Sequence, residues 1–205
     1  MKLYAAPGTC SLSPHIVALE AGIALELEKV DNKTKRTASG GDFLKINPKG
    51  YVPALQLDNG EVLTEGPTLV QYLADQKPQS GLAPANGTLA RYRLQEMLGY
   101  INSEIHKTYS PLFKAETPPE VKQQRKETLH KRYALLEQVL EKQEWLVGEH
   151  FTGADAYLFT VTNWAKYVDL DLSEFKALAA FQQRVAARPA VQAAMEAEGL
   201  IKKSA

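Results

Sequence analysis

The chain has 205 residues, of which 44% are hydrophobic and 23% charged, a composition typical of a folded globular protein. Its 24 Lys and Arg residues balance 24 Asp and Glu residues, so the charge gives no indication of a nucleic-acid partner or an anionic membrane surface. The single cysteine, Cys10, excludes an internal disulfide, a C-x-x-C redox pair and a multi-cysteine zinc site.

Other features of the sequence favour a cytoplasmic protein. No run of about 18 apolar residues occurs, so no transmembrane helix is expected. Near the first residue, Pro7 and Gly8 interrupt the apolar stretch before it reaches the length of a signal peptide. The single cysteine also fits the cytoplasm, because that compartment is reducing and disulfides are rare in it.

The first part of the chain alternates between strand and helix patterns. The expected elements are a strand at residues 2–5, a helix at 12–21 that Gly22 can end, a strand at 25–30, a polar loop at 31–41 and a short helix at 42–46. Two short apolar runs, 53–57 and 61–64, then flank Asn59 and Gly60. Because both turn residues tolerate positive φ, these runs predict an antiparallel hairpin. A further helix begins near Pro67.

The second part of the chain shows only helical patterns. Residues 78–87 have the composition of a linker. Helices are expected at residues 88–113, from Pro118-Pro119 to about 144, at 153–167 and at 173–188, where Pro189 ends the pattern. The sequence therefore predicts a βαβαββα domain at residues 1–80 and an all-helical domain at residues 87–205.

The order of elements, with Pro53 heading the third strand, resembles a thioredoxin-type fold. Three segments narrow the resemblance to the bacterial beta class of glutathione transferases: residues 7–12 (Pro-Gly-Thr-Cys-Ser-Leu), 47–55 (Asn-Pro-Lys-Gly-Tyr-Val-Pro-Ala-Leu) and 63–66 (Leu-Thr-Glu-Gly). The resemblance covers essentially the whole chain, including residues 151–157 and 188–191. It implies a glutathione site in the first domain, an electrophile site and dimer contacts in the second, and a homodimer.

Pro53 is the key structural residue of this resemblance. In similar proteins the Val52–Pro53 bond is cis and turns the Val52 backbone outward, where it pairs with the cysteinyl backbone of glutathione. The alternative for the sequence alone is a trans proline at the start of an edge strand.

Glu65 and Gly66 come just before a helix, whose N-terminus favours an anion. The resemblance implies that they hold the γ-glutamyl group, although many relatives have Ser or Thr in place of Gly66. It also implies that Lys35 reaches the glycyl carboxylate. For the sequence alone, the alternative is that neither residue binds a ligand: Glu65 is then an acidic residue favoured in the first turn of a helix, and Lys35 is a solvated lysine in the loop.

Cys10 lies at the start of the first helix, where the helix dipole is expected to lower the pKa of its thiol. The resemblance implies that Cys10 takes the place of the Tyr or Ser of other classes and can form a mixed disulfide with glutathione. It also implies that Ser11 donates a hydrogen bond to the sulfur site. The alternative is a buried structural cysteine.

Gly99, Ser103 and His106 are spaced to share one helix face. The resemblance implies that this region faces glutathione, in part across a dimer interface, through Gly99, Ser103, Glu104, Ile105 and His106. His106 and Lys107 are then cations or donors near Cys10. Many relatives have Asn where Gly99 stands, and a lone His106 is otherwise a surface histidine.

Three further interpretations concern the stability of a helix, the site of the second substrate and the remaining histidines. Thr152 and Asp155 have the spacing of a capping box. The aromatic residues that can line an apolar pocket, or else belong to the core, are Tyr4, Tyr109, Phe113, Trp164 and Tyr167. The remaining histidines have no metal-ligand spacing and are expected at the surface: His15, His130 and His150.

The sequence thus predicts a transferase that binds reduced glutathione as cosubstrate, without a metal, and presents its thiolate to a small hydrophobic electrophile. Glutathione-dependent disulfide exchange through Cys10 is a second activity of the same site. The alternative is a non-catalytic, transferase-like binding or stress-response protein, which need not retain Cys10, Lys35 and Glu65. A dithiol oxidoreductase would need a second cysteine.

Overall fold

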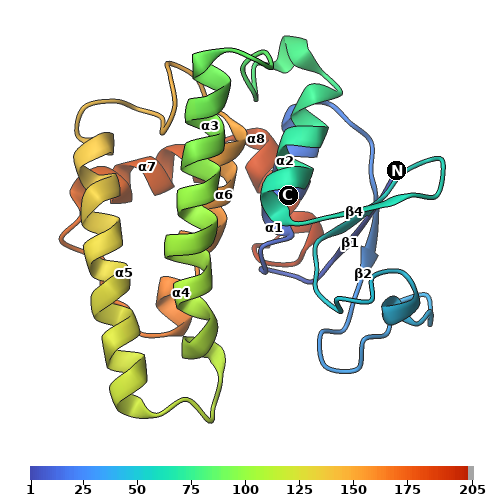
Figure 1. Ribbon diagram of the computed structural model, residues 1–205, viewed down its shortest axis with the longest axis horizontal. Helices are drawn as coiled ribbons and strands as arrows, with labels where there is room; N and C mark the ends of the chain where they lie inside the picture. The colour runs from blue at the N-terminus through green and yellow to red at the C-terminus, as the bar shows by residue number, and fades with distance from the viewer. Residues whose placement is uncertain (203–205) are drawn as a thin grey trace.

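The computed structural model describes residues 1–202. Figure 1 shows that the molecule has two parts: a small sheet with the helices that cover it, and beside it a group of longer helices. The sheet has the order β2-β1-β3-β4. Its strands are β1 (Lys2–Ala5), β2 (Glu26–Lys29), β3 (Ala54–Gln56) and β4 (Val62–Thr64). β1 runs parallel to β2 and antiparallel to β3, and β3 pairs antiparallel with β4. The predicted hairpin and the thioredoxin-like order are confirmed.

The alternation of side chains along the strands builds two apolar layers. Leu3 and Leu55, which are paired across β1 and β3, lie in the main core with α1 (Leu12–Glu20) and α2 (Gly66–Asp75). Tyr4 faces the other side of the sheet, where it packs in a smaller cluster beneath residues 30–52. The main core continues without interruption into the helical part of the chain.

A 3-10 turn, η1 (Phe43–Lys45), lies between β2 and β3. The helical part begins after a second 3-10 turn, η2 (Pro78–Ser80). Its elements are α3 (Leu89–Tyr100), the π-helical η3 (Ile101–His106), α4 (Lys107–Tyr109), the 3-10 turn η4 (Ser110–Phe113), α5 (Pro119–Leu140), α6 (Gly153–Thr162), the 3-10 turn η5 (Ala165–Tyr167), α7 (Lys176–Ala186) and α8 (Pro189–Ala197). Within residues 1–202, no helix combines the length and the apolarity that crossing a membrane requires.

Two predictions about these helices are wrong. The helix expected at residues 88–113 is not uniform, because a π-helical turn at Ile101–His106 interrupts it and changes which residues share a face. Pro189 ends the preceding pattern as expected, but it also begins α8, which the sequence analysis missed. Proline favours the first turn of a helix, where its missing N–H has no intrahelical partner.

α6 is the central helix of the molecule, and all of its residues are buried. It packs against α1, and it approaches α2 at Gly153: a Cβ atom there would lie 2.2 Å from Val70 Cγ1. Its start is held by the predicted capping box. Asp155 Oδ2 accepts from Thr152 N (2.7 Å) and Thr152 Oγ1 (2.8 Å), and Asp155 Oδ1 accepts from Leu146 N (2.8 Å).

Asp155→Ala is expected to lower the free energy of unfolding by about 2–4 kcal/mol, because three buried donors lose their acceptor. Asp155→Asn keeps one acceptor oxygen and is expected to lose less. Urea unfolding of the wild type and both variants measures the series. An alanine variant as stable as the wild type would contradict this role of Asp155.

Gly153→Ala is expected to destabilise the protein by about 1–3 kcal/mol, because the new methyl group overlaps Val70 on α2. The control is Gly99→Ala in α3, where a Cβ atom meets nothing within 4 Å. That change is expected to be neutral or to stabilise by about 0.5–1 kcal/mol through helix propensity. Thermal unfolding of the two variants tests the contrast, and equal effects would refute it.

Candidate functional site

A cleft of about 730 Å³ lies between the sheet domain and the helices that follow α3. The sheet domain contributes Cys10, Asn47, Lys49, Tyr51, Val52, Pro53, Thr64, Glu65 and Gly66. The helical part contributes Asn102, His106, Lys107, Ser110, Lys114 and Tyr157. Seven of the predicted site residues are therefore brought together from both parts of the chain.

The Val52–Pro53 peptide bond is cis, as predicted. It lies directly before β3, so Val52 stands at the point where the sheet meets the cleft. The Cys10 thiol donates a hydrogen bond to the Val52 carbonyl, with Sγ 3.4 Å from the oxygen. The reactive sulfur and the backbone predicted to bind glutathione are thus neighbours.

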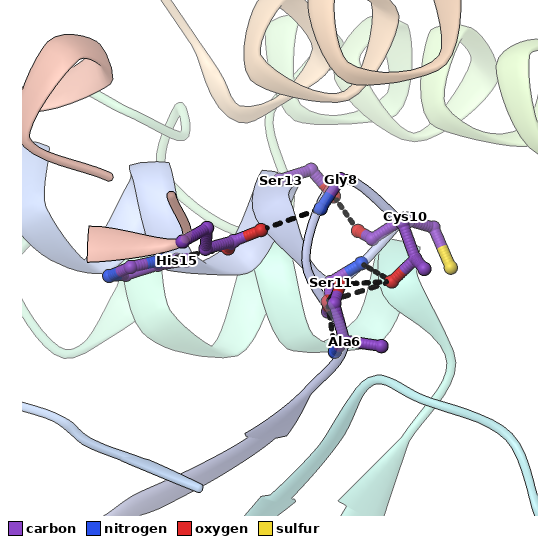
Figure 2. A network of polar contacts seen from close by, with 8 residues as sticks. Ala6, Gly8, Cys10, Ser11, Ser13 and His15 are labelled. Atoms are coloured by element: carbon purple, nitrogen blue, oxygen red, sulfur yellow. Dashed lines mark hydrogen bonds and ion pairs between the residues drawn. The ribbon is translucent and has the colours of Figure 1, made fainter. Parts of the chain in front are cut away.

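The loop that carries Cys10 is held together by Ser11. Ser11 Oγ donates to the Ala6 carbonyl at 3.1 Å, accepts from the Ala6 N–H at 3.2 Å and lies 2.9 Å from Thr9 Oγ1. Figure 2 shows these bonds, with the Cys10 sulfur pointing away from them. The prediction that the Ser11 hydroxyl serves the sulfur is wrong, because the hydroxyl is buried and used within the loop.

Two residues from the helical part of the chain also form hydrogen bonds with this loop. Gly8 N–H donates to Glu198 Oε2 at 2.9 Å, and the Gly8 carbonyl accepts from Trp164 Nε1 at 2.8 Å. The second oxygen of Glu198 lies 3.0 Å from His15 Nδ1. His15 was expected at the surface and is instead buried, because a carboxylate 183 residues further along the chain is its partner.

The pKa of Cys10 departs from the sequence expectation. Burial raises it to about 12, and this outweighs the backbone N–H groups of Cys10 and Ser11 and the charge of Lys107, which all lower it. The expectation of a pKa lowered by the helix dipole is therefore wrong for the net effect. At neutral pH Cys10 is a thiol and acts as a hydrogen-bond donor.

Glu65 has a strained backbone, with φ +71° and ψ 117°, at the start of α2. Its side chain forms an ion pair with Lys49, with a distance of 2.8 Å between Nζ and Oε1. Pro67 has no N–H, and the N–H groups of Thr68 and Leu69 both bond to the Glu65 carbonyl. Gly66 is thus the first-turn residue whose N–H can meet an anion.

The π-helical turn brings Asn102 and His106 to the same tyrosine on α6. The Tyr157 hydroxyl donates to Asn102 Oδ1 at 3.0 Å and lies 2.6 Å from His106 Nδ1. Because a tyrosine has one hydroxyl proton, Nδ1 of His106 is the donor in the second bond, and Nε2 is left as an acceptor. Trp164 packs edge-on against the imidazole ring of His106.

His106 is neutral at physiological pH. Burial lowers its pKa to about 4, with a smaller contribution from the charge of Lys107. Of the two roles expected for His106, cation or donor, the lowered pKa excludes the cation at neutral pH, and Lys107 is the positive charge beside the sulfur. Burial also raises the pKa of Tyr157 far above its ordinary value, so this hydroxyl keeps its proton.

Besides Ser11, five predicted residues lie outside the cleft of this single chain. Lys35 Nζ donates to the Gly50 carbonyl at 2.8 Å and lies 5.8 Å from the centre of the ring of Tyr51, which does line the cleft. The others are Gly99 and Ser103, which bond to each other, Glu104, which pairs with Arg132, and the fully buried Ile105. Contact of these residues with glutathione stays a prediction.

The five aromatic residues that were expected either to line an apolar pocket or to belong to the core do not line this cleft. Tyr4, Tyr109 and Trp164 are buried in the core, and none of the five candidates lines the cleft. The helical side of the cleft is instead polar and positively charged. In residues 1–202 no group of three or more His, Cys, Asp or Glu side chains is placed to hold a metal ion, and the absence of a metal stays a prediction.

Sequence analysis missed several residues of the cleft. The motif at residues 47–55 contains three of them: Asn47, Lys49 and Tyr51. The sequence analysis used this motif to identify the family and did not assign these three residues to the site. Tyr157 follows the capping box and was expected to be buried core. Asn102 and Lys114 had no signal, because only the π-helical turn and the chain path after α4 bring them to the cleft.

The rate of Cys10 alkylation by iodoacetamide in the folded protein is expected to rise about tenfold per pH unit from pH 7 to 10, because the reactive thiolate remains a minor species below its raised pKa. In the urea-unfolded chain the rate should level off above about pH 9. Mass spectrometry follows the reaction without ambiguity, since the chain has one cysteine. A plateau below pH 9 in the folded protein would show a lowered pKa and overturn this result.

Comparison with known proteins agrees with the geometry of the site. The family models of the N-terminal and C-terminal domains of glutathione S-transferase match residues 8–76 and 100–189. Glutathione S-transferase GstA of Escherichia coli O157:H7 is 46% identical over 98% of this chain and 100% of its own. A sphingomonad glutathione S-transferase solved in complex with glutathione is 46% identical, with a TM-score of 0.95 over 98% of this chain and 100% of that one. A bacterial beta class glutathione S-transferase of Sphingomonas chungbukensis is 45% identical, with a TM-score of 0.95 over 98% and 100%. This chain therefore belongs to the glutathione S-transferase family, in its bacterial beta class.

Proposed function

We propose that this transferase binds reduced glutathione along the sheet-domain side of the cleft and joins its sulfur to a small hydrophobic electrophile on the helical side. The observation that carries the proposal is the meeting in one cleft of Cys10, the Val52–Pro53 segment and the start of α2. The similar sphingomonad enzyme, which was solved with glutathione, supports the same cosubstrate.

In this proposal the backbone of Val52 pairs with the cysteinyl part of glutathione as an added strand. The γ-glutamyl carboxylate lies at the Gly66 N–H, and Glu65 meets the ammonium group. Lys35 takes the glycyl carboxylate; its ammonium has three donors, so the bond to the Gly50 carbonyl can remain. A serine at position 66, common among relatives, would also fit, since a Cβ there comes no closer than 3.8 Å to Tyr157.

The chemistry follows from the charge states of the side chains. The thiol of glutathione donates a hydrogen bond to Nε2 of His106 and loses its proton to solvent, because a histidine with a pKa of about 4 is a poor base at neutral pH. Lys107 and the Cys10 S–H then stabilise the glutathione thiolate. The thiolate attacks the electrophile: a sulfur–carbon bond forms, and the leaving group departs with its electron pair.

Two activities of the same site are not equally supported. Disulfide exchange requires the Cys10 thiolate as the attacking group, and the raised pKa of Cys10 weighs against it. Conjugation needs Cys10 only as a donor, which agrees with its bond to Val52. The proposal also includes a cytoplasmic homodimer, in which Gly99, Ser103 and Glu104 lie close to glutathione, in part across the dimer interface. The Ile105 side chain is fully buried in this chain, so only its backbone can take part.

The purified protein is expected to conjugate 1-chloro-2,4-dinitrobenzene at a rate that saturates with glutathione. Tyr157→Phe is expected to lower kcat about tenfold with little change in the KM for glutathione, because the hydroxyl orients His106 and is already hydrogen-bonded to His106 and Asn102. The absorbance of the conjugate measures both values.

The matched control is Tyr92→Phe, since Tyr92 is 59% exposed on α3 and lies outside the cleft. Its kinetics should equal those of the wild type. A wild type with no turnover above the uncatalysed rate would refute the proposed function. A Tyr157→Phe variant with unchanged kcat would refute only the role given to Tyr157.

A further inference from the structure

The charges of the cleft are unevenly distributed. Four charged side chains line it: Lys49, Glu65, Lys107 and Lys114. Lys49 and Glu65 neutralise each other through their ion pair of 2.8 Å. The side-chain ammonium groups of Lys107 and Lys114 have no ion-pair or hydrogen-bond partner among residues 1–202, and His106 is neutral there. The helical side of the cleft therefore carries two uncompensated positive charges.

These two lysines share one wall with a hydroxyl group. Lys107, Ser110 and Lys114 follow each other at intervals of three and four residues through α4 and η4, and all three line the cleft. Between them, Tyr109 and Leu112 are buried in the core, so the segment has one apolar and one polar side. All three cleft residues are exposed and able to meet a ligand.

Their position makes them part of the electrophile site, a step that rests on the proposed function. Glutathione occupies the sheet-domain side in that proposal, with its sulfur beside Cys10. The second substrate must then approach the sulfur from the side of Lys107, Ser110 and Lys114. A purely apolar substrate would leave the charges of Lys107 and Lys114 unpaired, whereas an anion would pair with them. Tyr51 and Tyr157 also line the cleft and can pack against the apolar body of such a substrate.

We propose that the electrophile is an anion: a small aromatic or unsaturated molecule with a carboxylate group, which Lys107, Lys114 and the Ser110 hydroxyl bind while its apolar body faces the glutathione sulfur. Two positive side chains in a cleft raise the local concentration of anions. Ser110 supplies a neutral donor that completes the binding of a carboxylate. The carboxylate is bound but takes no part in the reaction.

For an aryl chloride the reaction balances as follows. Glutathione loses its thiol proton to solvent, and its sulfur forms a bond to the ring carbon that carries chlorine. The carbon–chlorine bond then breaks, and chloride leaves with the electron pair. The carboxylate of the substrate remains ionised throughout, at a position on the ring away from the reacting carbon.

The test compares 4-chloro-3,5-dinitrobenzoate with 4-chloro-3,5-dinitrobenzamide, which share the reacting carbon and the leaving group and differ in charge. The wild type is expected to show a KM for the benzoate that is about fivefold lower than for the amide at low ionic strength. Lys114→Gln is expected to remove most of this preference by raising the KM for the benzoate alone. Added salt should weaken the preference of the wild type in the same way.

Lys114 is the variant of choice because Lys107 also acts on the glutathione sulfur, so its loss would slow both substrates. The matched control is Lys131→Gln on α5, which removes the same charge from an exposed position outside the cleft. It should leave both KM values unchanged. The KM for glutathione is measured for every variant.

The outcomes separate the two proposals. Turnover of the amide with no preference for the benzoate overturns the anionic substrate and leaves glutathione conjugation standing. A Lys114→Gln variant with a raised KM for glutathione, and not for the benzoate, also overturns it, because the lysine then binds a carboxylate of glutathione. No turnover of either compound, while 1-chloro-2,4-dinitrobenzene is conjugated, also overturns the anionic substrate; only the failure of all three compounds refutes the proposed function itself.

Discussion

The site depends on the hydrogen bonds that hold the backbone of Gly8. This loop lies between β1 and α1, where its polar groups need partners that neither element supplies. Glu198, just after α8, accepts from the Gly8 N–H, and Trp164, after α6, donates to the Gly8 carbonyl. Both partners come from the helical part of the chain. The position of Cys10 is therefore set by the packing of the two parts against each other, and α8 is a support of the site even though it contributes no residue to the cleft.

Burial determines the charge of the groups at the centre of the cleft. It raises the pKa of Cys10 to about 12 and lowers that of His106 to about 4, so that both are neutral at physiological pH. The fixed positive charges lie on lysines that reach the cleft from an exposed helix face. Neutral groups can thus position the glutathione sulfur at close range, while Lys107 stabilises its negative charge and Lys114 is left for the second substrate.

Sequence analysis was most successful where neighbouring residues decide the structure. The Asn59-Gly60 hairpin and the capping box of Thr152 and Asp155 each depend on a few adjacent residues, and both are present. The cis bond before Pro53, which the resemblance implied, is present as well. It failed where partners come from distant segments. His15 was expected at the surface because its partner, Glu198, lies near the other end of the chain. Ser11 was assigned to the sulfur for a different reason: its partner Ala6 is only five residues away, but the path of the loop that brings them together has no sequence pattern.

By itself the sequence determined the order of strands and helices apart from the π-helical turn and α8, because this order follows from periodicity and turn residues. The contiguous motif around Pro53 led to the family through its resemblance. The tertiary structure alone decided which helical residues face that motif. A π-helical turn rotates Asn102 and His106 toward Tyr157, and the chain after α4 carries Lys114 back to the cleft. It also decided the protonation of Cys10 and His106, because a pKa depends on how much water the folded chain removes from each group, and that is a property of packing.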